Sequence, residues 1–403
     1  MNPPARTHAA VPPPSAGTVY PILLLVSAAH LLNDMMQSVI PAIYPLLKEQ
    51  FGFTFAQIGL ITLVFQLASS ILQPLVGRYA DRHPQPYSLT AGMCFTLLGL
   101  LALAFVSGFV PLLGAVALIG WGSSIFHPES SRVAQLAAGG RKGLAQSIFQ
   151  VGGNAGSAFG PLLAALVVIP YGQRAIAGLL PAAALAIVFL LRIGRWYRRR
   201  LAAAAAATIP DAGTPRLPQR KIRLALLILT VLVFSKYFYI ACMTNYFTFF
   251  LIDKFAFTVT EAQYSLFAFL AASAAGTVAG GPLGDRFGRK YVIWGSILGA
   301  APFALLLPYA GPSGTVALAA LIGLIISSAF SAIVVYATEL MPGRVGMIAG
   351  LFFGLMFGLG GLGSAFFGWL ADRTSIEFIF RISALLPLLG IITGLLPNVN
   401  HRR

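Results

Sequence analysis

Twelve long apolar segments constrain the fold of this chain more than any other feature of its 403 residues. Each is long enough for the roughly 20 residues of helix that cross a bilayer core about 30 Å thick. Only 9% of the residues are charged, against about 25% in an ordinary soluble domain, which excludes a soluble globular protein. We therefore predict an all-α membrane protein with twelve transmembrane helices. The segments span residues 21–46, 55–77, 88–108, 110–137, 143–169, 175–197, 222–251, 258–281, 290–310, 312–340, 344–370 and 375–396.

The positions of the basic residues orient these segments in the membrane. Connections that follow even-numbered segments, together with the two chain ends, hold 20 of the 27 Lys and Arg residues, whereas the other connections hold five. Because Lys and Arg collect on the cytoplasmic side, both termini are predicted to be cytoplasmic. The net charge of +16 comes from short clusters between apolar runs, so no nucleic-acid partner is expected.

An internal repeat divides the chain into two halves. Gly77-x-x-x-Asp81-Arg82 recurs 204 positions later as Gly281-x-x-x-Asp285-Arg286, and three further matches lie close to this offset. Such a repeat predicts two six-helix bundles in parallel orientation with a cavity between them near the membrane midplane. The predicted parts are a disordered tail (1–20), an N-terminal bundle (21–197), a cytoplasmic linker (198–221), a C-terminal bundle (222–396) and a second tail (397–403).

The segment from Gly281 to Lys290 matches the G-x-x-x-D-R-x-G-R-K pattern of the major facilitator superfamily, which the chain therefore resembles. The earlier copy has Pro84, Gln85 and Pro86 where Gly-Arg-Lys would stand. Glycines permit a tight turn, and Asp and Arg can pair with helix ends, so these residues are expected to form a cytoplasmic gate. The expected gate residues are Gly77, Asp81, Arg82, Gly281, Asp285, Arg286, Gly288, Arg289, Glu339 and Arg344.

A closer resemblance rests on residues 30–38, 126–134 and 143–154, and extends to 235–239 and 288–296. These stretches are similar to the fosmidomycin resistance protein family within the same superfamily. The resemblance implies a bacterial inner-membrane exporter of a small phosphonate antibiotic that is driven by inward proton flow. Composition and spacing alone indicate only a membrane carrier.

Asp34 lies near the middle of the first segment, where a charge is costly and usually functional. His30, Asn33 and Gln37 share its helical face, which we expect to line the cavity. A buried carboxylate can change its protonation when the cavity opens to the other side, so we predict that Asp34 couples transport to protons. The alternative is a static polar contact between helices.

Glu129 and Arg132 are three residues apart in the fourth segment, so they can pair along a helix, and Arg132 could also reach Asp34. They form either an acid and base pair in proton coupling or an ion pair that stabilises the inner mouth. His127 could tune this site or sit beside the helix kink at Pro128. A metal held by the two histidines and Glu129 lacks a spacing signature, so no metal is expected.

Lys236, inside the seventh segment, needs an anion from the protein or from a ligand, and a phosphonate supplies one. Tyr239 is placed with it in the substrate site. The alternative is a permanent salt bridge to Asp34 or Glu129. Gln150 and Asn154 belong to a polar stripe on the fifth segment and are also expected to contact substrate.

The prediction is a monomeric proton-coupled antiporter that exports a small phosphonate such as fosmidomycin by alternating access, with the proton gradient as its energy source and no cofactor. The first alternative is a proton-coupled uptake symporter for a small organic phosphate or carboxylate, because the same cations would serve import. A receptor built on a carrier fold would bind ligand without turnover. An intramembrane enzyme is disfavoured because no catalytic triad or metal spacing is present.

Overall fold

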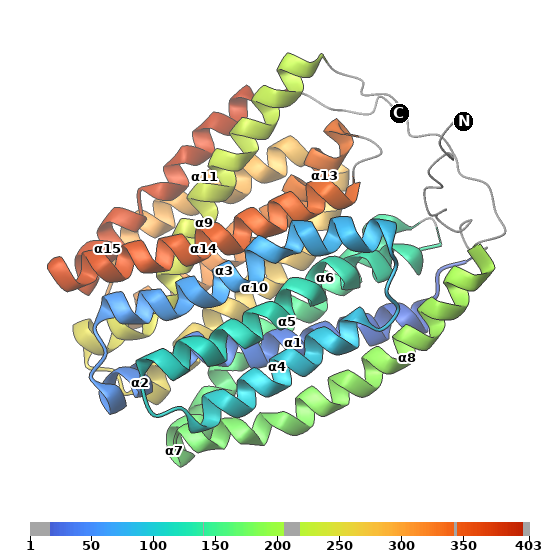
Figure 1. Ribbon diagram of the computed structural model, residues 1–403. Coiled ribbons are helices and arrows are strands. Elements are labelled where there is room, and N and C mark those ends of the chain that lie inside the picture. The colour runs from blue at the N-terminus through green and yellow to red at the C-terminus, as the bar shows by residue number, and fades with distance from the viewer. Residues whose placement is uncertain (1–16, 140, 205–217, 342–344, 398–403) are drawn as a thin grey trace, which may run out of the picture.

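The computed structural model describes residues 17–397 except 140, 205–217 and 342–344. Twelve segments, each made of one helix or of consecutive helical elements, are long and apolar enough to cross a membrane. The described residues contain no strand. The predicted all-α, twelve-span architecture is confirmed. The long helices lie side by side along a common direction (Figure 1).

Six spans form the N-terminal half, and short irregular turns extend two of them. The π-helical turn η1 lengthens the fifth span, and the 3₁₀ turn η2 begins the sixth. The elements are α1 (Tyr20–Ala42), α2 (Tyr44–Phe51), α3 (Phe55–Arg82), α4 (Ser88–Phe105), α5 (Phe109–Leu136), α6 (Lys142–Leu163), η1 (Ala164–Val168), α7 (Ile169–Tyr171), η2 (Gln173–Leu179) and α8 (Leu180–Ala204).

The C-terminal half repeats this order of six spans. The tenth span is built from α12 and α13, and the twelfth from α15 and η4. The elements are α9 (Gln219–Phe255), α10 (Val259–Phe287), α11 (Arg289–Leu306), η3 (Leu307–Tyr309), α12 (Pro312–Ser327), α13 (Ala329–Leu340), α14 (Val345–Arg373), α15 (Ile376–Ser383) and η4 (Leu386–Leu395).

Two matching capping boxes extend the internal repeat. Thr54 accepts a hydrogen bond from the Gln57 backbone N–H at the start of α3, and Thr258 does the same for Glu261 at the start of α10. In both boxes the third helical residue bonds back to the cap, which satisfies two otherwise unpaired N–H groups. The two threonines are 204 positions apart, the offset of the Gly-x-x-x-Asp-Arg repeat.

Glycines allow α6 to pack directly against α1. A Cβ added to Gly152, Gly156 or Gly160 would overlap the backbone of α1 or the side chain of Ser38. Small residues at such positions let two membrane helices approach closely. This packing fixes the polar face of α6 beside that of α1.

The even number of spans places the start of α1 and the end of η4 at the same end of the bundle, which we call the terminal end; the opposite end is the distal end. At the distal end the two halves are joined by hydrogen bonds. Asp372 accepts from the backbone N–H groups of Phe55 and Ala56, and Gln263 donates to the Ala42 carbonyl. Within the described residues, the recorded hydrogen bonds between the halves all lie in the distal part of the molecule.

The α3 and α14 helices run antiparallel across the boundary between the halves and separate toward the terminal end. A Cβ added to Gly361 would lie 2.7 Å from the Cβ of Gln66. A Cβ added to Gly358 or Gly354 would lie 3.5 Å or 3.6 Å from the nearest atom of Ser70. A Cβ added to Gly350 would lie 4.0 Å from the Cα of Pro74. The boundary is therefore closed distally and wider toward the terminal end.

Candidate functional site

A cavity of about 280 Å³ lies between the two halves. Helices of both halves line it, as the repeat predicts for a central site. Seven predicted proton or substrate residues are on its wall, namely His30, Asp34, Gln37, His127, Gln150, Asn154 and Lys236. Four others, Asn33, Glu129, Arg132 and Tyr239, do not line it.

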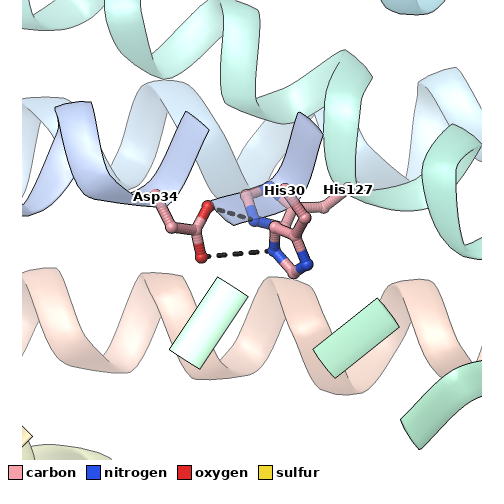
Figure 2. A group of neighbouring side chains, drawn as sticks. All are labelled: His30, Asp34 and His127. Carbon is pink, nitrogen blue, oxygen red and sulfur yellow. Dashed lines mark ion pairs between the residues drawn. The ribbon is translucent and has the colours of Figure 1, made fainter. Parts of the chain in front are cut away.

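His30, Asp34 and His127 form one cluster on the cavity wall. Figure 2 shows the carboxylate of Asp34 facing both imidazole rings. Its Oδ2 atom is 3.2 Å from Nε2 of His30, and its Oδ1 atom is 3.4 Å from Nε2 of His127. The first contact is within α1 at i, i+4 spacing, whereas the second joins α1 to α5.

The hydrogen bonds of the two imidazole rings bear on where their protons lie. Nδ1 of His30 is 2.8 Å from the Phe149 carbonyl oxygen, and Nδ1 of His127 is 3.1 Å from the Ser123 carbonyl oxygen. A carbonyl oxygen only accepts, so Nδ1 of His30 carries the hydrogen, and a neutral His30 ring turns an unprotonated Nε2 toward Asp34. The Ser123 hydroxyl, which can donate or accept, is also 3.1 Å from Nδ1 of His127, so either tautomer of His127 fits. Each neutral ring has one nitrogen that can take an added proton. The cluster therefore has room for up to two protons.

Neighbouring residues hold the cluster in place. The Asn33 amide donates to Oδ1 of Asp34 at 2.9 Å, so this predicted substrate residue contacts the carboxylate instead of the cavity. His30 stacks on Phe149 with ring centroids 4.1 Å apart. A Cβ on Gly153 would overlap the His30 ring, so a glycine is needed there. The sequence does not distinguish this role of Gly153 from the helix packing of Gly152, Gly156 and Gly160 on the same helix.

The metal trio considered from the sequence is not assembled. Glu129 lies apart from the two histidines and pairs with Arg132 at 3.6 Å. The ligand atoms of His30, Asp34 and His127 do lie within 4.8 Å of one another, a spacing that suits a shared cation or shared protons. The expectation that the protein needs no metal stays a prediction.

Lys236 is the cation of the cavity. Its side chain is only 1% exposed, and its Nζ lies 5.3 Å and 5.7 Å from the ring centroids of Tyr237 and Phe330. In the described part of the chain no carboxylate lies within ion-pair distance of this ammonium group. The proposed permanent salt bridge to Asp34 or Glu129 is therefore wrong for this conformation. A buried ammonium group beside aromatic rings is suited to an anionic ligand.

Tyr239 is not a cavity residue, which corrects its assignment to the substrate site. It is buried in the apolar core, whereas Tyr237, Ile240 and Thr244 line the cavity. These three residues follow the i, i+3, i+7 spacing of one helical face. The sequence favours Tyr239 because it lies three residues from Lys236 on the same helical face, but the cavity lies on the side of the helix that carries Tyr237.

Glu129 and Arg132 lie further toward the terminal end of α5 than His127. Glu129 is 1% exposed and also lies 3.5 Å from the donating Ser88 hydroxyl. The recorded contacts of Asp34 are with His30, His127 and Asn33. The predicted approach of Arg132 to Asp34 is therefore not observed, and the geometry is that of an ion pair near the terminal mouth.

Several cavity residues escaped the sequence reasoning. Thr62 on α3 donates to Asn245 on α9 at 2.7 Å and also contacts the Tyr44 hydroxyl, and the bond to Asn245 joins the halves in the cavity wall. Ser273 and Thr277 line the opposite wall from α10. Their i, i+4 spacing inside an apolar segment is the signal that could have found them.

The predicted gate is described only in part. Arg289 and Glu339 form the expected ion pair, which joins α11 to α13 within the C-terminal half. Gly288 has φ of 91°, which allows the sharp turn between α10 and α11, and Arg286 stacks over its neighbour Phe287. A Cβ added to Gly77, within α3, would lie 4.0 Å from the Cβ of Pro128. The side chains of Asp81, Arg82 and Asp285, the surroundings of Gly281, and all of Arg344 lie outside the described residues.

The chain is similar to known transporters over nearly its whole length. The family model described as Major Facilitator Superfamily matches residues 26–254 and 229–403. A protein of Escherichia coli (strain K12) named fosmidomycin resistance protein is 57% identical over 96% of this chain and 95% of its own length. The uncharacterized MFS-type transporter YfnC of Bacillus subtilis (strain 168) is 44% identical over 94% of each chain.

Proposed function

This chain belongs to the major facilitator superfamily, and from that premise we propose that it is a proton-coupled antiporter that exports a small phosphonate such as fosmidomycin. It is a multi-pass membrane transporter and not an enzyme. The name of the Escherichia coli relative supports the choice of substrate. The proposal places the protein in the bacterial inner membrane as a monomer.

One observation carries the proposal: a proton-binding cluster lines the same cavity as a buried cation that has no carboxylate partner among the residues that the structure describes. Lys236 is available to the phosphonate, and the His30–Asp34–His127 cluster is available to protons. A phosphonate oxygen beside Lys236 would supply the anion that the protein does not. The cavity of about 280 Å³ suits a ligand of a few to a dozen heavy atoms.

Protons and substrate exchange because both satisfy the same acceptors. When the cluster is deprotonated, it presents a carboxylate and two imidazole lone pairs to the cavity. A hydroxyl donor at the other end of a phosphonate would satisfy these acceptors, whereas bound protons would remove them. Protons entering from the outside therefore displace the substrate, and their release to the cytoplasm prepares the site for the next molecule.

The orientation fits loading from the cytoplasm. The positive-inside rule assigns the terminal end to the cytoplasm. The boundary between the halves widens toward this end, so the conformation corresponds to the inward-facing state in which an exporter takes up its cargo. Bonds across the distal end would then separate the cavity from the outside.

The uptake symporter remains the rival because protonation makes the cavity more positive. Two added protons change the cluster from a net charge of −1 to +1, which would draw an anion in together with the protons. The two mechanisms predict opposite proton movements when substrate binds. An antiporter releases protons, and a symporter takes them up.

Transport in inside-out vesicles tests the direction of flux. Labelled fosmidomycin should accumulate in vesicles with an imposed acidic interior, and the Asp34→Asn variant should lose this accumulation while it remains in the membrane. Accumulation only in right-side-out vesicles with an inward proton gradient would establish the symporter instead. An absence of transport in both, with the protein present, would remove fosmidomycin as the substrate.

A further inference from the structure

The Gly-x-x-x-Asp-Arg pattern occurs a third time, at the end of α14. Gly368, Asp372 and Arg373 have the spacing of Gly77, Asp81 and Arg82 at the end of α3. The α3 and α14 helices pack antiparallel, so the two copies lie at opposite ends of one helix pair. The third copy is thus at the distal end of the molecule, and the structure describes its side chains.

Asp372 caps the first turn of a helix in the other half. Its Oδ1 accepts from the Phe55 N–H at 2.9 Å, and its Oδ2 accepts from the Ala56 N–H at 2.7 Å. These are two of the N–H groups that a helix start leaves without internal partners. Thr54 caps the N–H of Gln57. Asp372 therefore caps the N–H groups of Phe55 and Ala56, which Thr54 does not reach. A carboxylate at this position is also favoured by the helix dipole.

The rest of the pattern serves the same contact. A Cβ on Gly368 would overlap the carbonyl oxygen of Phe55, so the glycine allows α3 to come close enough for Asp372 to reach it. The guanidinium group of Arg373 lies over the Trp369 ring at 4.3 Å and 3.5 Å from the Trp369 carbonyl oxygen. Arg373 is therefore held on its own helix, and both carboxylate oxygens of Asp372 remain with α3.

The contact lies at the closed end of a boundary that opens in the other direction. The glycine distances between α14 and α3 increase from the overlap at Gly368 to 4.0 Å at Gly350. Any rocking motion that opens the distal end must separate Phe55 from Gly368 and break both bonds to Asp372. These bonds exist in one state of the transporter and not in the other, which is the requirement for a gate.

We propose that Gly368 and Asp372 form the distal gate of this transporter, in which a carboxylate from the C-terminal half caps α3 of the N-terminal half while the cavity is open at the terminal end. Asp372 is a positioning residue that sets the balance between the two states and does not contact substrate. The inference requires alternating access but neither a phosphonate nor protons.

Labelling of a cavity cysteine tests the gate without substrate. In a background with Cys94→Ser and Cys242→Ala, Thr244→Cys places one thiol on the cavity wall. A membrane-impermeant maleimide is then applied from the distal side. The Asp372→Asn variant should react at least about threefold faster than its parent, because an amide loses the charge and offers one acceptor where two are needed.

Asp253→Asn is the matched control. Asp253 is an exposed carboxylate near the distal end of α9 with no recorded bond to the other half, so its variant should react at the parental rate. Gly368→Ala provides a second variant and should also react faster, because its methyl group forces Phe55 away. Labelling of Asp372→Asn and Gly368→Ala at the parental rate, with normal amounts of protein in the membrane, would overturn the proposal.

Discussion

The carboxylate of Asp34 on α1 lies 3.4 Å from Nε2 of His127 on α5, and both groups line the cavity between the two halves. The Nδ1 atom of His127 faces the carbonyl and hydroxyl oxygens of Ser123, each 3.1 Å away, and a protonated His127 donates from Nε2 to Asp34. Proton occupancy of the site is therefore linked to a contact between two helices.

Binding of fosmidomycin should weaken as the pH falls. Protons that fill the His30–Asp34–His127 cluster remove the acceptors that the substrate needs, so affinity should decrease by up to about tenfold per competing proton for each pH unit. Isothermal titration of the purified protein at a series of pH values on both sides of neutrality measures this dependence. Asp34→Asn should flatten the curve, and an Asp34→Asn curve as steep as that of the wild type would contradict the prediction.

Lys236→Met should weaken phosphonate binding about tenfold to a hundredfold, because a hydrogen-bonded charge pair with the ligand is lost. The same titration at one pH measures the change. Tyr239→Phe is the matched control on the same helix, since Tyr239 does not line the cavity, and its affinity should stay within about twofold. Equal affinities for wild type and Lys236→Met would remove Lys236 from the substrate site.

Gly153→Ala should impair transport as strongly as His30→Ala. The added methyl group would overlap the His30 ring, and the resulting strain in a packed interior costs about 1–3 kcal/mol or displaces the ring. Gly114→Ala is the control because a Cβ there meets no atom within 4 Å. Fosmidomycin resistance of cells carrying each variant, with membrane levels measured in parallel, tests the effect. Normal resistance with Gly153→Ala would show that the ring position is not critical.

Glu129→Gln should change the rate of transport but keep the pH dependence of binding. Glu129 pairs with Arg132 outside the cavity, so its removal should alter the opening of the terminal mouth and leave the proton cluster intact. Initial rates in vesicles and binding curves at several pH values separate the two effects. A flat pH dependence in this variant would return Glu129 to proton coupling.

The spans and the repeat could be predicted from the sequence because both are local properties of composition and spacing. Helical periodicity also brought His30, Asp34 and Gln37 to one face, since residues of one helix keep their register whatever surrounds them. Most boundaries of the twelve predicted spans agree within about four residues with the membrane-spanning ranges of the structure.

Contacts between helices could not be predicted in the same way. The pairing of Asp34 with His127 depends on how α1 and α5 are rotated against each other, which spacing within one helix does not reveal. For the same reason Arg132 was placed near Asp34 and Tyr239 was preferred to Tyr237. The contact of Asp372 with the start of α3 could not be predicted, because the two segments are more than 300 residues apart along the chain.

Proton release on substrate binding tests the central proposal most directly. Purified protein in detergent and weak buffer is mixed with fosmidomycin that has been adjusted to the same pH, and the change in pH is recorded. If protons and substrate share the site, substrate binding to the wild type should acidify the solution by between about zero and two protons per bound molecule. The number of protons released should rise as the starting pH is lowered. Asp34→Asn should release fewer protons at equal occupancy. Alkalinisation of the solution by the wild type, which means proton uptake with the substrate, would contradict antiport and establish the symporter.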